Sequence, residues 1–535
     1  MASESIELEF DLLGGQNVLD GPAYILQTPR QPSIGTLDPG TPVRMVQAYD
    51  VYSPNDRYDL STRPGFSDIW ATGAAISSVK GIITGMQYQG AIADRLLVTA
   101  SHAAQRHTLW YDNSGTATEI TLGTNLTIGQ DNLTTLLNFT DGSTPMTIIL
   151  SLQRDLPQSV NASAVAANFT IAGTGLTSLK PQFGAVFGGR VLYANCNRDG
   201  TVIQDRVYYT DLRDGNLITD HTTQFLSFER TDGDALKGML VLSDLAMAGS
   251  RNYLSFIVRN TVGSDPFRQQ DVAIGGGQGP VSHQGMVRVS KQGAAWAATA
   301  GIFSLEGQQG EIIKERTPYL RPYWKGLNTD RYEFISAGYD TATEIGLWAV
   351  SESGQTAHNK VIGVNFATGE NYIWTLSRNA FATRLVSGEQ RLVGGGFTTG
   401  KVFNEVRTSV FTGNIEDAAG IIDGDIITPR HHCNQRSRVK LFEGIKVNFD
   451  QQGTSEAVTV QWRLNDASTW NSFADSPYTV PGTAGEVRQK YFPLMKAGTH
   501  LQLRFRCNNS GQVFRIQGYI LVFKILTDGV VVPTT

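Results

Sequence analysis

The histidines and cysteines of this sequence are the side chains best suited to metal binding and nucleophilic catalysis. The chain has 8 histidines and 3 cysteines, and the one place where they cluster is His431-His432-Cys433. A zinc site needs about four ligands at suitable spacing, and no Cys-x-x-Cys pair or second cluster completes one. No Gly-x-Ser-x-Gly nucleophile motif occurs either. We interpret the cluster as loop residues, although a triad of distant residues stays open because triads are spatial.

Two other kinds of binding site need to be considered: a phosphate site at the glycine-rich runs and a calcium site at the Asp-Gly-Asp sequences. Gly275–Gly279 and Gly394–Gly396 are rich in glycine. Neither run is followed by the Lys-Ser/Thr pair of a phosphate-binding loop, so we interpret both as flexible loops between strands. Asp-Gly-Asp occurs at 232–234 and at 423–425, but an EF-hand loop needs more oxygen ligands and a terminal Glu. We interpret both as turns, and the sequence predicts no catalytic residue, metal ligand or cofactor.

Five possible N-glycosylation sequences lie between residues 125 and 170. In secreted proteins, Asn-x-Ser/Thr sequences suggest glycans. The N-terminus MASESIELEFDLLGG is acidic and lacks the apolar run of a signal peptide or membrane span. An odd number of distant cysteines, Cys196, Cys433 and Cys507, also favours a reducing compartment. We therefore interpret the asparagines as β-turn composition. They are Asn125, Asn132, Asn138, Asn161 and Asn168.

Composition favours an all-β protein. Glycine accounts for 56 of 535 residues and charged residues for 17%, against usual shares of about 7% and about 25%. Hydrophobic residues make up 41%, which excludes a disordered chain. The net charge is −5 and no block of like charges occurs, so the basic stripe of a nucleic-acid binder is absent.

Between about residues 77 and 413, short runs of β-branched and aromatic residues alternate with Gly, Asp, Asn and Ser turns. Asp141-Gly, Asp199-Gly and Asp423-Gly are among the expected hairpin turns. Strand pairs recur at roughly 40–50 residues, the period of propeller blades. We predict a β-propeller-like body over residues 66–430, with a set of stacked β-sandwiches as the alternative.

The two ends of the chain differ from this body. Residues 1–65 contain closely spaced prolines, which favour extended backbone, so we expect an N-terminal arm that lies on a surface. Residues 431–535 alternate cleanly between apolar and polar side chains, as in Val458, Val460, Trp462 and Leu464. This alternation predicts an antiparallel β-sandwich, similar to a jelly roll, followed by a short tail.

Several segments together resemble the tail nozzle proteins of short-tailed bacteriophages, which include the packaged-DNA stabilisation proteins and tail tubular proteins. The resemblance covers about residues 55 to 415 and is one of pattern and order. The segments are LSTRPGFSDIW (60–70), LKPQFGAVFGGRVLYANCNRDGTVIQDRVYYTDLRDGNLIT (179–219), SDPFRQQDVAIGGGQGPVSHQGMVRVSKQGAAWAATAGIFSLEG (264–307) and YLRPYWKGLNTDRYEFISAGYDTATEIGLWAVS (319–351).

This resemblance implies a structural virion protein without enzymatic activity or cofactor. It implies a homohexameric ring below an adaptor, with fibres or spikes around it. Genomic DNA would be retained above the ring and conducted through its lumen at ejection, without sequence-specific binding. The protein would be made in the bacterial cytoplasm and act in the virion tail, with no membrane-spanning segment.

Two alternatives stay open. The first is a receptor- or glycan-binding tail protein, whose candidate stacking platforms are Trp110, Trp296, Trp348 and Trp374; buried blade positions are the other explanation for these residues. The second is a propeller glycoside hydrolase, which needs a pair of carboxylates. Asp and Glu are spread evenly along the chain, so no such pair can be nominated.

Overall fold

The structure is a computed structural model of the chain. It describes residues 6–11, 47–49, 51–52, 60–62, 65–68, 82–88, 95–101, 107–113, 116–124, 126–127, 133–151, 155–228, 233–261, 265–289, 293–306, 312–367, 369–386, 389–396, 401–406, 423–433, 438–450, 457–481, 487–508 and 514–526.

Seven antiparallel groups of four strands follow one another along the described residues, and we call them blades 1 to 7; six are separate sheets, and the strands of blade 6 belong to a larger sheet. Blade 1 is β6–β9 (Ile82–Tyr88, Leu96–Ser101, His107–Asn113, Thr116–Ile120), blade 2 is β10–β13 (Thr134–Asp141, Thr144–Ser151, Gln158–Asn161, Ala166–Asn168), and blade 3 is β15, β16, β17 and β19 (Leu179–Phe187, Arg190–Arg198, Thr201–Tyr209, Phe225–Ser227). Blade 4 is β20–β23 (Gly238–Val241, Leu245–Gly249, Leu254–Arg259, Phe267–Val272), and blade 5 is β24–β27 (Met286–Arg288, Ala294–Ala298, Gly301–Glu306, Ile312–Glu315). Blade 6 is β28–β31 (Ser336–Asp340, Ile345–Val350, Lys360–Asn365, Asn371–Trp374), and blade 7 is β32, β33, β34 and β5 (Arg378–Val386, Glu389–Gly396, Val402–Val406, Gly65–Asp68).

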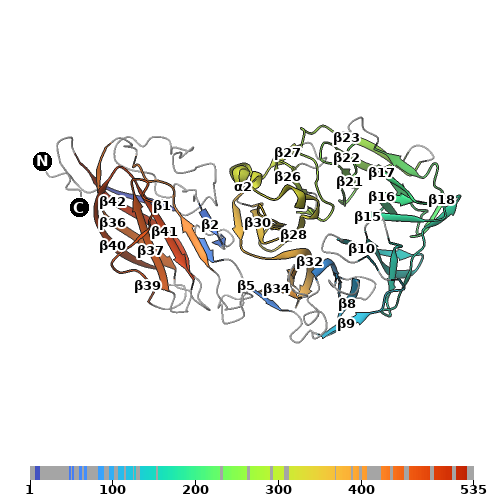
Figure 1. The fold of residues 1–535 in the computed structure, drawn as a ribbon, viewed down its shortest axis with the longest axis horizontal. Helices are drawn as coiled ribbons and strands as arrows, with labels where there is room; N and C mark the ends of the chain where they lie inside the picture. The colour runs from blue at the N-terminus through green and yellow to red at the C-terminus, as the bar shows by residue number, and fades with distance from the viewer. Residues whose placement is uncertain are drawn as a thin grey trace.

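The seven blades form a closed ring. The first strand of each blade contacts the first strand of the next, and β32 of blade 7 returns to β6 of blade 1 (Figure 1). Blade 7 takes its outer strand from the start of the chain, because β5 pairs with β34 through Phe403↔Asp68 and its neighbours. The prediction of a β-propeller-like body is therefore confirmed, and β5 closes the ring.

Packing between blades explains why their middle strands are apolar on both faces. All six residues of β29 and all five of β25 are buried. A strand covered on both faces by neighbouring sheets gives a continuous apolar run. Each fully buried large side chain contributes about 1.5–3 kcal/mol to stability.

The remaining strands form a β-sandwich, as predicted. One sheet contains β3 (Val51–Tyr52), β4 (Leu60–Thr62), β42 (Arg515–Ile525), β36 (Lys440–Asp450) and β40 (Val487–Gly498), with β1 (Ile6–Asp11) paired to β42. The facing strands are β35 (Gly424–Ile427), β41 (Leu501–Cys507), β37 (Ala457–Leu464) and β38 (Asn471–Ser472), with β39 (Tyr478–Thr479) paired to β37.

Sheet pairing extends the sandwich beyond the range 431–535 expected for it. β35 ends before residue 431 and pairs with β41. β1 and β4 come from the proline-rich arm and both pair with β42. The arm therefore contributes strands to the sandwich, and β5 at the arm's end belongs to the propeller.

The sandwich and the propeller share one sheet. Strand β2 (Gln47–Tyr49) pairs in parallel with β31 of blade 6 and antiparallel with β35, so ten strands form a continuous sheet. One hydrophobic core follows the same path and joins Tyr372 and Trp374 of blade 6 to Phe505 and Phe514 of the sandwich. The two parts lie side by side along the long axis, with β2 between them (Figure 1).

Short helices occur between blades 5 and 6. They are η1 (Pro318–Leu320), α2 (Arg321–Lys325) and η2 (Thr329–Phe334), and they bury Trp324 against Tyr332. A parallel pair of short strands, β14 (Ala172–Thr174) and β18 (Leu217–Asp220), flanks blade 3. No helix in the described part of the chain is long and apolar enough to cross a membrane.

Candidate functional site

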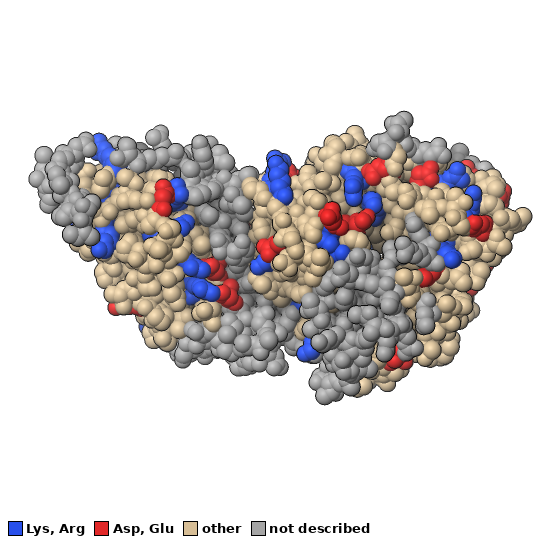
Figure 2. All heavy atoms as spheres, in the orientation of Figure 1, with Lys and Arg blue, Asp and Glu red and all other residues tan. Residues whose placement is uncertain are grey.

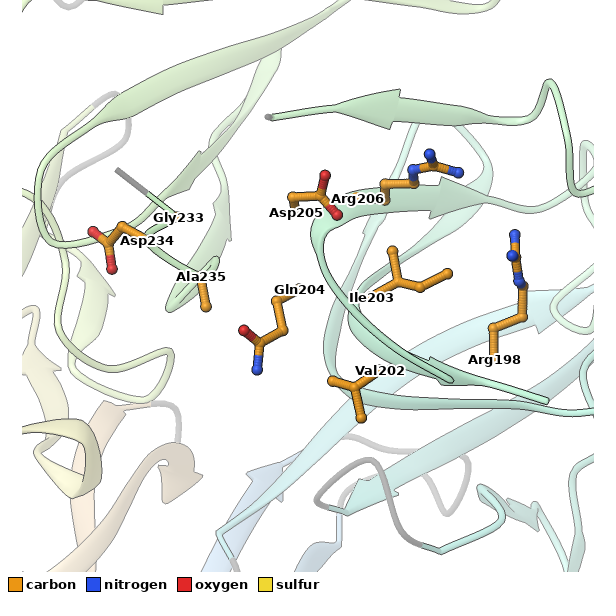
Figure 3. Close-up of a pocket in the computed structure, with 9 residues that line it drawn as sticks. All are labelled: Arg198, Val202, Ile203, Gln204, Asp205, Arg206, Gly233, Asp234 and Ala235. Atoms are coloured by element: carbon orange, nitrogen blue, oxygen red, sulfur yellow. The ribbon is translucent and has the colours of Figure 1, made fainter. Parts of the chain in front are cut away.

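A groove lies beside strand β17 of blade 3 (Figure 3). Its volume is about 540 Å³, within the range of small-molecule and peptide sites. One wall is β17 and the other is the segment Gly233–Ala235, which leads into β20. The lining residues are Arg198, Val202, Ile203, Gln204, Asp205, Arg206, Gly233, Asp234 and Ala235.

The hairpin between β16 and β17 positions the basic side chains of this groove. Asp199 and Gly200 form its turn with φ of 51° and 91°, the left-handed backbone that an Asp-Gly pair favours. Arg198 donates from Nη1 to the hydroxyl of Tyr208 at 3.3 Å. The guanidinium carbon of Arg206 lies 4.1 Å above the ring centroid of Phe225. Burial raises the pKa of Tyr208, and nearby Arg198 acts in the opposite direction.

The opposite wall is tied to the blade through the backbone. Leu236 donates its N–H to the carbonyl of Gln204 at 3.0 Å, and Phe228 donates to the carbonyl of Asp205 at 2.7 Å. Asp234 accepts from the backbone N–H of Asn252 at 3.3 Å. These contacts hold Asp234 beside β17 and make the second wall acidic.

The segment before β24 bridges blades at the centre of the ring. Gln284 donates from Nε2 to the carbonyl of Thr134 in blade 2 at 2.7 Å. His283 stacks on Phe183 of blade 3 with ring centroids 4.8 Å apart, and Ser282 donates to the carbonyl of Ile335 before blade 6. This stretch braces the propeller.

Carboxylates and guanidinium groups interleave where β35 meets β41. Arg504 donates to Asp425 through Nε at 2.8 Å and Nη2 at 2.7 Å, and Arg506 binds Asp423 in the same way. Arg463 lies 4.5 Å from the ring centroid of Trp470. Among the coloured atoms of Figure 2, blue and red side chains lie next to one another and most of the rest are uncharged.

The interpretation of Asp423-Gly-Asp425 as a turn is wrong. Asp425 lies inside β35, and both carboxylates bind arginines about 80 residues later in the chain, with sequence separations of 79 and 83. The Asp-Gly dipeptide favours a turn, but here the two carboxylates are held by arginines that lie far away in the sequence. In the other Asp-Gly-Asp sequence, Asp232 lies outside the described residues.

The interpretation of Gly394–Gly396 as a loop is also wrong, because these residues belong to β33. A Cβ on Gly394 would lie 2.7 Å from the side chain of Arg378, which is buried against Phe403. Glycine here makes room for a buried arginine. The other glycine run, Gly275–Gly279, does form a turn, and Gly279 lies tightly against the carbonyl of Ser250.

The histidine cluster lies in the connection between β35 and β36, as the loop interpretation expects. His431 is nevertheless 3% exposed, forms an isolated β-bridge with Leu501 and shares a 2.8 Å hydrogen bond with Tyr519. The rings of His432 and His500 lie 4.9 Å apart. Burial lowers the pKa of His431 to about 3 and raises that of Cys433 to about 12. Across the described ranges, no group of three or more His, Cys, Asp or Glu side chains could hold a metal ion.

The asparagines of the glycosylation sequences have structural contacts where the structure describes them. Asn161 accepts from the N–H groups of Ser163 and Val165 across a turn. Asn168 accepts from Gln158 at 2.9 Å, and Asn138 accepts from Thr147. Asn125 and Asn132 lie outside the described residues.

The four tryptophans considered as sugar platforms are buried in the blades. Trp110 is 5% exposed, Trp374 2%, and Trp296 and Trp348 0%. Trp296 donates to the carbonyl of Gln278 and Trp348 to that of Gly285. Stacking on a sugar requires an exposed ring face, so the platform alternative is wrong for these residues and the explanation as buried blade positions is confirmed.

Known proteins resemble this chain in structure alone. No protein-family model matches it, and no curated protein matches its sequence. Similar solved structures include YCF48 from Cyanidioschyzon merolae (6% identity, TM-score 0.36, covering 61% of this chain and 96% of that one). They also include the Pan2 WD40 domain of Neurospora crassa (8%, 0.35, 67% and 98%) and a glycoside hydrolase (9%, 0.27, 85% and 99%). Likenesses this distant carry no argument about activity.

Proposed function

We propose that this chain is a structural subunit of the tail of a short-tailed bacteriophage, where six copies form a ring around the path of the packaged DNA. The observation that carries the proposal is the continuous sheet from blade 6 through β2 and β35 into the sandwich. Together with the shared core around Trp374 and Phe505, it joins the propeller and the sandwich into one continuous body. A ring that retains DNA needs subunits that do not hinge.

The segments that carry the phage resemblance fall mainly on strands of the propeller and on the connections between its blades, which also supports the proposal. Residues 60–70 contain β4 and the ring-closing strand β5, and residues 179–219 contain the first three strands of blade 3. Residues 264–307 run from β23 to β26 and include the central brace, and residues 319–351 contain α2 and the start of blade 6.

Charge is compatible with a conduit for DNA. Affinity for DNA comes mainly from Lys and Arg contacts to phosphates, and a net charge of −5 would let the genome pass without being held. Closed cyclic rings are the usual solution for homo-oligomers. In this proposal the ring joins an adaptor above, carries fibres or spikes around it, and acts in the virion tail.

Electron microscopy of the purified full chain, alone and with its adaptor, tests the proposal. We expect ring-shaped particles whose class averages show sixfold symmetry, and a native mass of six chains. A chain that stays monomeric under both conditions and never joins a tail complex would contradict it.

A further inference from the structure

The groove beside β17 has features of a peptide-binding site. We propose that it binds an extended acidic segment of a partner protein, which adds a short strand to the free edge of β17. The inference stands on the groove itself and does not depend on the proposed function.

Strand β17 has a free edge over part of its length. β16 pairs along one side of it, from Leu192↔Tyr209 to Arg198↔Thr201. On the other side β19 reaches only Arg206, Val207 and Tyr208. The carbonyls of Gln204 and Asp205 accept from Leu236 and Phe228, so among the described residues the stretch without a strand partner on that side is Thr201–Ile203. An exposed strand edge offers backbone donors and acceptors to an incoming strand.

The groove reaches both faces of this edge. Arg198, Ile203 and Arg206 lie on one side of β17, and Gln204 points towards the segment that carries Asp234 and Ala235 (Figure 3). Side chains of an added strand alternate between two faces. One side chain of the peptide would therefore meet the arginines, and the next would meet Val202 and Ala235.

The arginine face favours a carboxylate. Arg198 donates to the hydroxyl of Tyr208, and the guanidinium group of Arg206 lies over the ring of Phe225. A planar guanidinium group matches a carboxylate with two parallel hydrogen bonds. An acidic side chain of the peptide would thus bind on this face.

The other face favours an apolar neighbour for that acidic side chain. Val202 is 48% exposed, and an apolar side chain packed on it would remove both from water. Asp234 lies with Ala235 on the other wall of the groove, where the apolar side chains of the peptide, and not its carboxylates, would lie. A strand that alternates acidic and apolar residues meets all of these conditions.

Binding of two synthetic peptides to the full chain tests the proposal. The probes are acetyl-TEVEVT-amide and acetyl-TKVKVT-amide, compared by calorimetry, with hydrogen exchange followed at Thr201–Ile203. We expect the glutamate peptide to bind about tenfold more tightly than the lysine peptide and to slow exchange at these amides. A proline peptide, acetyl-TEPEVT-amide, should bind more weakly because proline lacks an N–H.

Charge reversal supplies the matched variants. Arg198→Glu should reverse the preference between the two peptides, whereas Arg268→Glu, an exposed position on β23, should leave it unchanged. Arg198→Gln gives a second variant, in which the preference should disappear, should Arg198→Glu fail to fold. The proposal would be overturned by equal binding of both peptides or by a preference that neither Arg198 variant changes. Tighter binding of a dT10 oligonucleotide would overturn it as well.

Discussion

Asp425 and Arg504 form a two-pronged ion pair across strands β35 and β41, with N–O distances of 2.8 and 2.7 Å. β35 is the strand through which the sandwich continues, by way of β2, into blade 6. Asp425 is 6% exposed. The pair therefore fastens the sandwich at its junction with the propeller.

Removing one partner of this pair should destabilise the junction. Asp425→Ala leaves the arginine without its carboxylate partner, and we expect a loss of about 2–4 kcal/mol in the free energy of unfolding. The double variant Asp425→Ala/Arg504→Leu should lose less than the sum of the two single variants. Urea unfolding of all four proteins measures the coupling, and strictly additive losses would contradict a paired role.

The close approach of Gly394 to the buried side chain of Arg378 leads to a second prediction. A Cβ at residue 394 would meet the buried arginine side chain at 2.7 Å, so Gly394→Ala should cost about 1–3 kcal/mol through overpacking. Gly276→Ala is the matched control, because a Cβ there meets nothing within 4 Å and should change stability by less than about 0.5 kcal/mol. Thermal unfolding of the two variants measures the difference, and equal melting temperatures would show that Arg378 moves aside freely.

Local sequence was sufficient for the features that depend on neighbouring residues. Asp199-Gly200 and Asp141-Gly142 predict tight hairpins, and the chain reverses there, between β16 and β17 and between β10 and β11. The alternation of Val458 and Val460 predicts a one-sided sheet, and both valines are buried in the sandwich core. Such signals span a few residues and need no knowledge of the rest of the chain.

Features built from distant residues could not be read in this way. The closing strand β5 comes from a proline-rich stretch, and its partner β34 lies more than 300 residues later, as Asp68↔Phe403 shows. The groove combines β17 with a segment of the next blade, which no spacing rule connects. The local sequence suggests that Asp423 is a turn residue, and only the structure shows that it binds Arg506.

The three thiols should be unreactive in the folded protein. Cys196 and Cys507 are buried, and burial raises the pKa values of Cys196 and Cys433, that of Cys433 to about 12. Since the thiolate is the reactive form, a disulfide reagent such as DTNB should titrate three thiols only after denaturation. Fast reaction of one equivalent with the native protein would show that a thiol is accessible.

Acid should destabilise the protein through its buried histidines. His358 is 0% exposed and contacts Ser351 at 3.0 Å and the carbonyl of Phe334 at 2.9 Å. Burial lowers the pKa of His358 to about 4 and that of His431 to about 3, below the value of about 6.5 in an unfolded chain. Below pH about 6.5 the unfolded chain therefore binds protons that the folded chain excludes.

The stability that these histidines contribute is fully present above pH about 6.5 and is lost as the pH falls towards about 4. We expect the free energy of unfolding in urea to fall between pH 7.5 and pH 4.5. His358→Gln should lower stability at pH 7.5 yet make this fall shallower, because about one fewer proton is taken up on unfolding. His221→Gln, at the half-buried surface turn after β18, is the matched histidine variant measured beside it. A slope that His358→Gln leaves unchanged would mean that other groups control the acid sensitivity.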